Sequence, residues 1–105
     1  MDAVFKALAD PGRRALLDAL HASDGQPLGA LCDVLPTMTR FGVAKHLAVL
    51  EEAGLVTSVR SGRQKIHFLN PVPIRDIHDR WISRYATSHL DALAALRATA
   101  EGERA

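Results

Sequence analysis

Residues 37–70 read TMTRFGVAKHLAVLEEAGLVTSVRSGRQKIHFLN, and this stretch decides the fold. Its first half has apolar residues at helical spacing, which predicts one helix over 37–53 that is capped by a threonine and ends at a glycine. Two β-branched and apolar runs between 55 and 70, joined by a tight turn at Ser61-Gly62, predict a two-stranded hairpin. The buried stripe of the helix is expected to consist of Val43, Leu47 and Leu50.

Positive charge is concentrated on this helix and hairpin. Residues 37–70 hold five basic residues against two glutamates, a net charge of +3, whereas residues 1–36 carry −2 and residues 71–105 are balanced. The five basic residues are Arg40, Lys45, Arg60, Arg63 and Lys65. A positively charged helix fits the major groove of DNA, and a hairpin beside it reaches a neighbouring backbone or minor groove. The sequence therefore predicts DNA binding by helix 37–53 and a hairpin wing over 55–70.

Individual side chains on this surface have different expected roles. Arg40 and Lys45 lie off the apolar stripe and are expected to hydrogen-bond guanine or to hold phosphates. Phe41 is expected either to press on a thymine methyl group or to pack against the preceding helix. The basic wing residues are expected to contact phosphate or the minor groove, which adds affinity more than specificity. The candidate DNA-contacting residues are Thr39, Arg40, Phe41, Lys45, His46 (with a structural or a phosphate-facing role), Arg60, Arg63 and Lys65.

Helix signals precede this stretch. Asp10-Pro11 is a helix start, because aspartate is a good cap and proline fits the first helical position. The helix that it opens is expected to end near Gly25. Residues 2–9 are expected to form a short amphipathic helix, and a third helix is expected from Pro27 to Pro36.

The C-terminal part is predicted to be one long helix. It starts at Ile74, after a proline-rich joint, and continues through Leu93 and Leu96. The resulting order of elements is mainly α with a small β-hairpin, as in a winged helix-turn-helix. Residues 1–100 are expected to form this single domain, with a dimerisation helix over about 73–98 and a flexible tail over 101–105.

The last helix presents a wide apolar surface for so small a chain. A chain of 105 residues has little core left to cover that surface once the hairpin is packed. The sequence therefore predicts a homodimer in which the terminal helices meet their symmetry mates. The expected interface residues are Val4, Phe5, Leu8, Ile74, Ile77, Trp81 and Tyr85.

Cysteine usage and hydropathy exclude several classes of protein. The single cysteine, Cys32, excludes an internal disulfide and fits a reducing cytoplasm. The apolar runs are far shorter than the roughly 20 residues that span a bilayer, and no signal peptide is evident. No nucleophile stands in a recognisable frame and no glycine-rich phosphate loop is present, so the chain is not expected to be an enzyme. These features predict a cytoplasmic protein that binds no membrane.

Several segments resemble the ArsR family of winged-helix transcriptional regulators. The matching segments are ALADPGRRALLDAL over 7–20, HLAVLEEAGLV over 46–56 and the wing RSGRQKIHFL over 60–69. NPVPIRDIHDRWISRY over 70–85 is similar to a subgroup that lacks the metal-binding signature. The resemblance implies a homodimeric repressor that binds an inverted-repeat operator in double-stranded DNA. It implies no cofactor and specifies neither a small-molecule nor a metal inducer.

Two alternatives stay open from the residues. Metal-sensing members of the family carry a cysteine motif where this chain has only Cys32, and some zinc sensors use a pattern of four ligands on the last helix. Asp76, His78 and His89 match three of those four positions, whereas Ala92 cannot coordinate, so a metal-responsive repressor is the alternative and no metal is the default. A winged-helix module that binds proteins instead of DNA is the second alternative, which the five basic residues disfavour.

Overall fold

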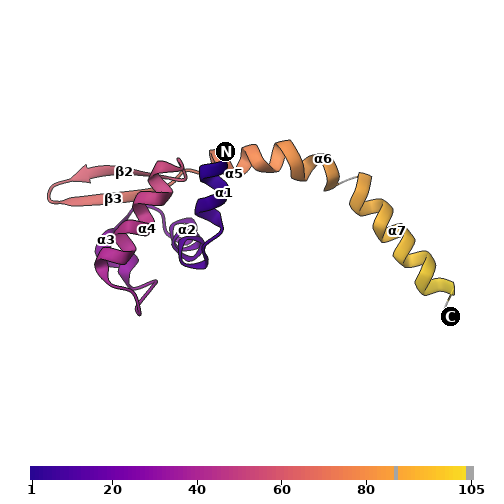
Figure 1. Cartoon of the computed structure of the whole chain (residues 1–105), viewed down its shortest axis with the longest axis horizontal. Helices are drawn as coiled ribbons and strands as arrows, with labels where there is room; N and C mark the ends of the chain where they lie inside the picture. Colours follow the sequence, from indigo (N-terminus) through magenta and orange to yellow (C-terminus); the bar gives the residue numbers. More distant parts are fainter. Residues whose placement is uncertain (87, 104–105) are drawn as a thin grey trace. The chain divides into compact units, whose positions relative to one another are not determined.

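The computed structural model describes residues 1–86 and 88–103, with the side chains at 88–90 and 103 outside that description (Figure 1). The chain divides into two compact units, Met1–Pro73 and Ile74–Ala105. The first unit holds the three-stranded sheet and the helices that precede it, and the second holds helices alone. The division falls at the start of the predicted dimerisation helix.

The two N-terminal helices follow from local sequence signals. Helix α1 spans Asp2–Leu8 and α2 spans Pro11–Ala22. The Asp10 carboxylate caps α2 by accepting a 3.0 Å hydrogen bond from the backbone N–H of Arg13. The same bond lowers the pKa of Asp10, because it stabilises the charged carboxylate. The predicted start and end of α2 are confirmed.

Helix α3 is shorter than the sequence predicted. It spans Leu28–Cys32, whereas the expected helix ran from Pro27 to Pro36. The chain beyond it closes tight turns instead, with the N–H of Val34 bonded to the carbonyl of Leu31 at 3.1 Å. Proline cannot continue a helix, and its predecessor is restricted too, so the helix ends before Pro36 rather than at it.

Helix α4 spans Arg40–Glu52, inside the predicted range. Of the two threonines ahead of it, Thr39 is the cap, and its hydroxyl accepts a 3.0 Å hydrogen bond from the N–H of Gly42. Gly54 follows the helix at a φ of +78°, a left-handed conformation that glycine adopts without strain. The buried stripe consists of Val43, Leu47 and Leu50, as predicted.

The sheet has three strands rather than the predicted two. Strands β2, Val56–Ser61, and β3, Gln64–Leu69, pair antiparallel in the expected hairpin. A short strand β1, Gln26–Pro27, pairs with the other edge of β3, giving the order β1-β3-β2. Two residues that end in proline give no recognisable strand pattern, because proline lacks an N–H and is tolerated in sheets chiefly at edges.

The core of the first unit lies between the helices and the sheet. The largest fully buried side chains come from α2, α3, α4 and residues 55–56 at the start of the hairpin, and each stabilises the fold by roughly 1.5–3 kcal/mol. They are Leu16, Leu20, Leu31, Val43, Leu50, Leu55 and Val56. His67 is also buried, and its Nδ1 lies 3.0 Å from the carbonyl oxygen of Gln26, which ties β1 to β3.

The C-terminal part is helical but irregular. Helix α5 spans Val72–Ile77, a π-helical turn η1 spans His78–Ile82, α6 spans Ser83–Ala86 and α7 spans Ser88–Glu103. A π-turn inserts extra chain into the helix, so residues after η1 do not continue the apolar stripe that the sequence predicted from regular spacing. Helix α7 also includes the first residues of the predicted flexible tail, whereas Thr87 and residues 104–105 lie outside the description. No helix among the described residues has the length and hydropathy to cross a bilayer.

Candidate nucleic-acid interface

Helix α4 exposes one face opposite its buried stripe. Arg40 and Lys45 are exposed, and Phe41 is 76% exposed although it is apolar. The Nζ atom of Lys45 lies over the Phe41 ring, 5.9 Å from its centroid, which is a cation–π distance. The alternative in which Phe41 packs against the preceding helix is therefore wrong, and the ring is available to a partner.

The hairpin of β2 and β3 extends beyond α3 and α4 (Figure 1). Its turn lies at Gly62-Arg63, one residue later than predicted, and Gly62 has the positive φ of +62° that a two-residue turn requires at its first central position. Arg60 and Lys65 stand opposite each other across the hairpin, and both are exposed, as is Arg63. Like charges at opposite positions repel, so the wing tip is suited to an anionic partner.

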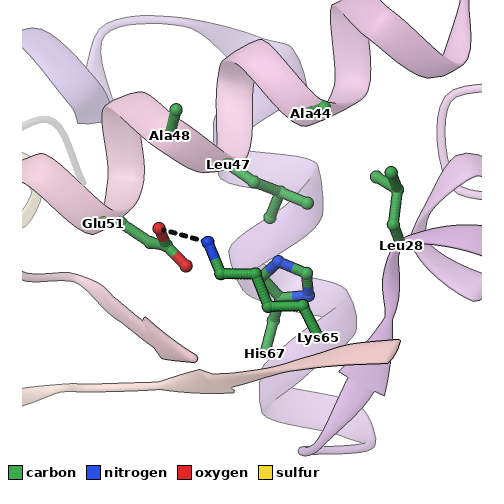
Figure 2. A pocket seen from close by; sticks show the side chains of 7 residues that line it. All are labelled: Leu28, Ala44, Leu47, Ala48, Glu51, Lys65 and His67. Atoms are coloured by element: carbon green, nitrogen blue, oxygen red, sulfur yellow. Dashed lines mark hydrogen bonds and ion pairs between the residues drawn. The ribbon is translucent and has the colours of Figure 1, made fainter. Parts of the chain in front are cut away.

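Lys65 also has a partner within the chain. Its Nζ atom lies 3.2 Å from Oε2 of Glu51. Both residues line a pocket of about 140 Å³ between α4 and β3 (Figure 2). Burial raises the pKa of Glu51, but the Ser58 hydroxyl and the Lys65 ammonium lower it by more, so the carboxylate stays charged. No local pattern marks Glu51, because the contact arises only when the end of α4 packs beside β3. The remaining pocket residues are Leu28, Ala44, Leu47, Ala48 and His67.

A second, larger depression separates α4 from the wing. This groove has a volume of about 400 Å³ and is lined by the first residue of α4, the wing tip and the β1–α3 segment. Its lining residues are Pro27, Leu28, Gly29, Arg40, Arg63, Gln64 and Lys65, of which none is acidic. The fold thus gathers three of the predicted DNA-contacting cations around one groove.

Comparison with known proteins decides the family. A helix-turn-helix domain family matches residues 8–59. YuzN, an HTH-type transcriptional regulator of Bacillus subtilis, is 43% identical over 86 residues, which are 77% of this chain and 94% of that protein. The structure of an ArsR-like transcriptional regulator from Rhodococcus sp. RHA1 matches with a TM-score of 0.72 and 32% identity, over 96% of this chain and 90% of that chain. The chain belongs to the ArsR family.

Membership of the ArsR family makes this protein a transcriptional regulator and not an enzyme. A further relative, the transcriptional repressor SdpR of Bacillus subtilis, is 30% identical over 76 residues, which are 72% of this chain and 82% of that protein. The family that the sequence motifs indicated is therefore confirmed, as is the winged-helix fold.

Of the two roles expected for His46 in this ArsR-family protein, structural or phosphate-facing, its contacts support the structural one. Its side chain is only 17% exposed, with Nε2 3.8 Å from the Asp10 carboxylate. Its Nδ1 lies 3.3 Å from a guanidinium nitrogen of Arg13, which also donates to the carbonyls of Lys6 and Ala7 at 2.9 Å. These contacts link His46 of α4 to the start of α2 and, through Arg13, to the end of α1.

The metal-sensing alternative gains no support from the described side chains. Among them, no three His, Cys, Asp or Glu residues gather closely enough to hold a metal ion. His78 is exposed, with Nδ1 3.3 Å from the carboxylate of Asp79, and the side chain of His89 lies outside the description. Cys32 is half-buried in a chain with no second thiol, so the cysteine site of metal-sensing ArsR members does not fit. The Asp76, His78 and His89 site stays an alternative, and the absence of a metal stays the prediction.

The residues predicted at a dimer interface differ in exposure. Phe5, Ile74 and Tyr85 are exposed large side chains, whereas Leu8, Ile77 and Trp81 are half-buried. Val4 is only 8% exposed and belongs to the core, because it lies on the face of α1 that packs against α2 and α4. Val4 is therefore wrongly assigned to the interface. Helix α7 adds two exposed leucines that the predicted interface did not include, Leu93 and Leu96.

Proposed function

We propose that this ArsR-family protein is a repressor that binds an inverted-repeat operator as a homodimer. The observation that carries the proposal is the set of Arg40, Phe41 and Lys45 exposed on α4, with Arg40 beside the basic wing tip. The name of its relative SdpR, a transcriptional repressor, supports repression as the result of binding. The proposed location is the cytoplasm, as the single cysteine predicts.

The proposed docking places α4 in the major groove, which is wide enough for one helix. Phe41 then contacts a thymine methyl group and Lys45 hydrogen-bonds guanine, because apolar and cationic side chains suit these base edges. The wing reaches the neighbouring minor groove or backbone, where Arg60 and Arg63 add affinity that does not depend on sequence.

The proposed dimer follows from the operator and from the exposed apolar side chains. An inverted repeat presents two equivalent half-sites, which a twofold-symmetric dimer reads with one α4 each. The exposed side chains Phe5, Ile74 and Tyr85 supply apolar surface that a second copy can cover. Phe5 lies on α1, Ile74 on α5 and Tyr85 on α6, and none of the three lies on α4.

A binding titration tests this function. Fluorescence anisotropy would be measured with labelled DNA from upstream of the protein's own gene and with a scrambled duplex of equal length, at about 150 mM salt. We expect tighter binding to the upstream DNA and loss of that preference in Phe41→Ala. Folded, dimeric protein that binds neither duplex at any salt concentration would contradict the proposal and favour a protein-binding module.

A further inference from the structure

We propose that the groove between α4 and the wing holds the DNA backbone, and that Arg40 binds phosphate there instead of reading a base. The inference rests on the proposed function and assigns a role to one of its residues. Its basis is the groove of about 400 Å³ that Arg40, Arg63 and Lys65 line together.

The shape of DNA explains why a backbone passes through this groove. In duplex DNA one sugar-phosphate strand separates each major groove from the minor groove next to it. When α4 occupies a major groove and the wing reaches the adjacent minor groove, that strand must run between the two elements. The groove lies between the start of α4 and the wing tip, which is the space that the strand would occupy.

The position of Arg40 within α4 favours phosphate over base contact. Arg40 is the first residue of the helix, and its guanidinium lies beside Gly29, with one nitrogen 3.9 Å from where a Cβ of residue 29 would stand. It therefore borders the groove that faces the wing, while Phe41 and Lys45 do not line that groove. A guanidinium and the positive N-terminal end of a 13-residue helix both favour an anion at this place.

The two cations that the wing contributes to the groove, Arg63 and Lys65, differ in their availability to phosphate. Arg63 is exposed at the wing tip, whereas the ammonium of Lys65 is bound to Glu51 in the pocket behind the groove. A phosphate that binds Lys65 must compete with that carboxylate. Arg40 and Arg63 are therefore the principal phosphate ligands, one from each wall.

The experiment compares Arg40→Ala, Arg40→Lys and Lys45→Ala on two duplexes across 50–200 mM salt. One duplex is a tight site selected from a randomised pool, and the other is its scrambled version. Lys45→Ala is the matched control, because it removes the same charge from the same helix outside the groove. Circular dichroism checks that each variant is folded, which is expected because Arg40 and Lys45 are exposed.

We expect Arg40→Ala to weaken binding to both duplexes by the same factor, and Arg40→Lys to restore most of the binding to both. Loss of one phosphate contact lowers the salt slope by about 0.9, so the loss at 50 mM should exceed that at 200 mM roughly threefold. Lys45→Ala should weaken the selected site more than the scrambled one. Single phosphates of the selected duplex would also be replaced by neutral methylphosphonates. At one position the replacement should lower the affinity of the wild type but not that of Arg40→Ala.

Two results would overturn the inference while the proposed function stands. One is a loss in Arg40→Ala confined to the selected site, which would make Arg40 a base reader. The other is unchanged binding of Arg40→Ala to both duplexes. Folded wild-type protein that selects no duplex from the randomised pool would instead overturn the proposed function, and the phosphate role with it.

Discussion

The ammonium of Lys65 lies 3.2 Å from the carboxylate of Glu51, and this ion pair joins the wing to the last turn of α4. Lys65 is about half exposed and Glu51 mostly covered, so the pair contributes modestly to stability. Its main consequence concerns DNA, because phosphate and Glu51 compete for the same ammonium. Arg63 and Lys65, two of the three cations of the wing, are therefore not equivalent.

We predict that Lys65→Ala changes DNA binding less than Arg63→Ala does. Arg63→Ala should lower the slope of log affinity against log salt by about 0.9, the value for one phosphate contact. Lys65→Ala should lower it by less, since Glu51 already holds the ammonium. Titrations of random-sequence duplex at several salt concentrations give both slopes.

The same competition provides a control. In Glu51→Gln the carboxylate charge is removed, so binding should strengthen and Lys65→Ala should then cost as much as Arg63→Ala. Glu52→Gln makes an equal charge change at an exposed position. It should not alter the ratio of the affinity lost in Lys65→Ala to the affinity lost in Arg63→Ala. Equal slopes for the two alanine variants in the wild-type background would refute the competition.

We predict that the Asp10 cap stabilises the protein only above acidic pH. The backbone N–H of Arg13 lowers the pKa of Asp10 below its ordinary 3.8, so the folded state binds this proton less readily than the unfolded state. The contribution is then complete above pH 3.8 and is lost as the pH falls through the lowered pKa. Asp10→Ala should have a lower Tm than the wild type at pH 7, and the difference should shrink towards pH 3.

Asp10→Asn separates the cap from the charge. Asparagine also caps helices, so this variant should keep most of the stability at pH 7 without the added pH dependence. A Tm difference between wild type and Asp10→Ala that stays constant from pH 7 to pH 3 would contradict the assignment.

We predict that Gly42 and Met38 are energetically coupled. A Cβ at residue 42 would lie 2.7 Å from Cγ of Met38, so alanine there displaces the methionine. In the Met38→Ala background, Gly42→Ala should stabilise the protein by up to about 1 kcal/mol, the helix preference of alanine over glycine. In the wild-type background the gain should be smaller. Urea unfolding of the four proteins measures the difference, and equal effects in both backgrounds would exclude the coupling.

We predict that Trp81→Ala shifts the protein towards monomer and weakens operator binding at the same time. Truncating an aromatic anchor in a dimer interface commonly costs about 2 kcal/mol or more. Light scattering at tens of micromolar protein gives the oligomeric state, and Arg84→Ala, an exposed change in the same region, is the control. A wild-type protein that is monomeric under these conditions would contradict the proposed homodimer.

We predict that zinc and a chelator leave operator affinity unchanged. A metal that altered DNA binding would have to be bound more tightly in one state than in the other, because coupling between sites is reciprocal. A several-fold, reversible loss of binding on addition of zinc, absent in His78→Ala, would instead establish the metal-responsive alternative. Anisotropy titrations with added zinc and with chelator provide the measurement.

The sequence predicted those parts of the fold that rest on local signals. The Asp10 cap, the stripe of Val43, Leu47 and Leu50 and the stop at Gly54 each depend on a few neighbouring residues, and all are confirmed. Strand β1 was missed because it exists only through pairing with β3, which is distant in sequence. The π-turn was missed because regular spacing implies a regular helix.

The sequence indicates which single residues of α4 are exposed, but it does not indicate the contacts between elements that shape the candidate site. Exposure of Arg40 and Lys45 follows from helical periodicity, whereas the sequence left two roles open for Phe41 and two for His46. The contacts that favour the structural role of His46 come from Asp10 and Arg13, which lie far from it in sequence. The groove and the Glu51 partner of Lys65 likewise arise from packing between separate elements. Contacts between residues that are distant in sequence produce no motif of fixed spacing, so the sequence alone does not reveal them.

A hydroxyl-radical footprint of the wild-type protein on a duplex selected from a randomised pool tests the central claim most directly. A dimer that inserts two copies of α4 should protect two half-sites related by inversion, with centres about one helical turn apart or a multiple of it. Phe41→Ala should lose this protection while remaining folded. Absence of any protected half-site, with folded protein at low salt, would contradict the claim that this surface reads DNA.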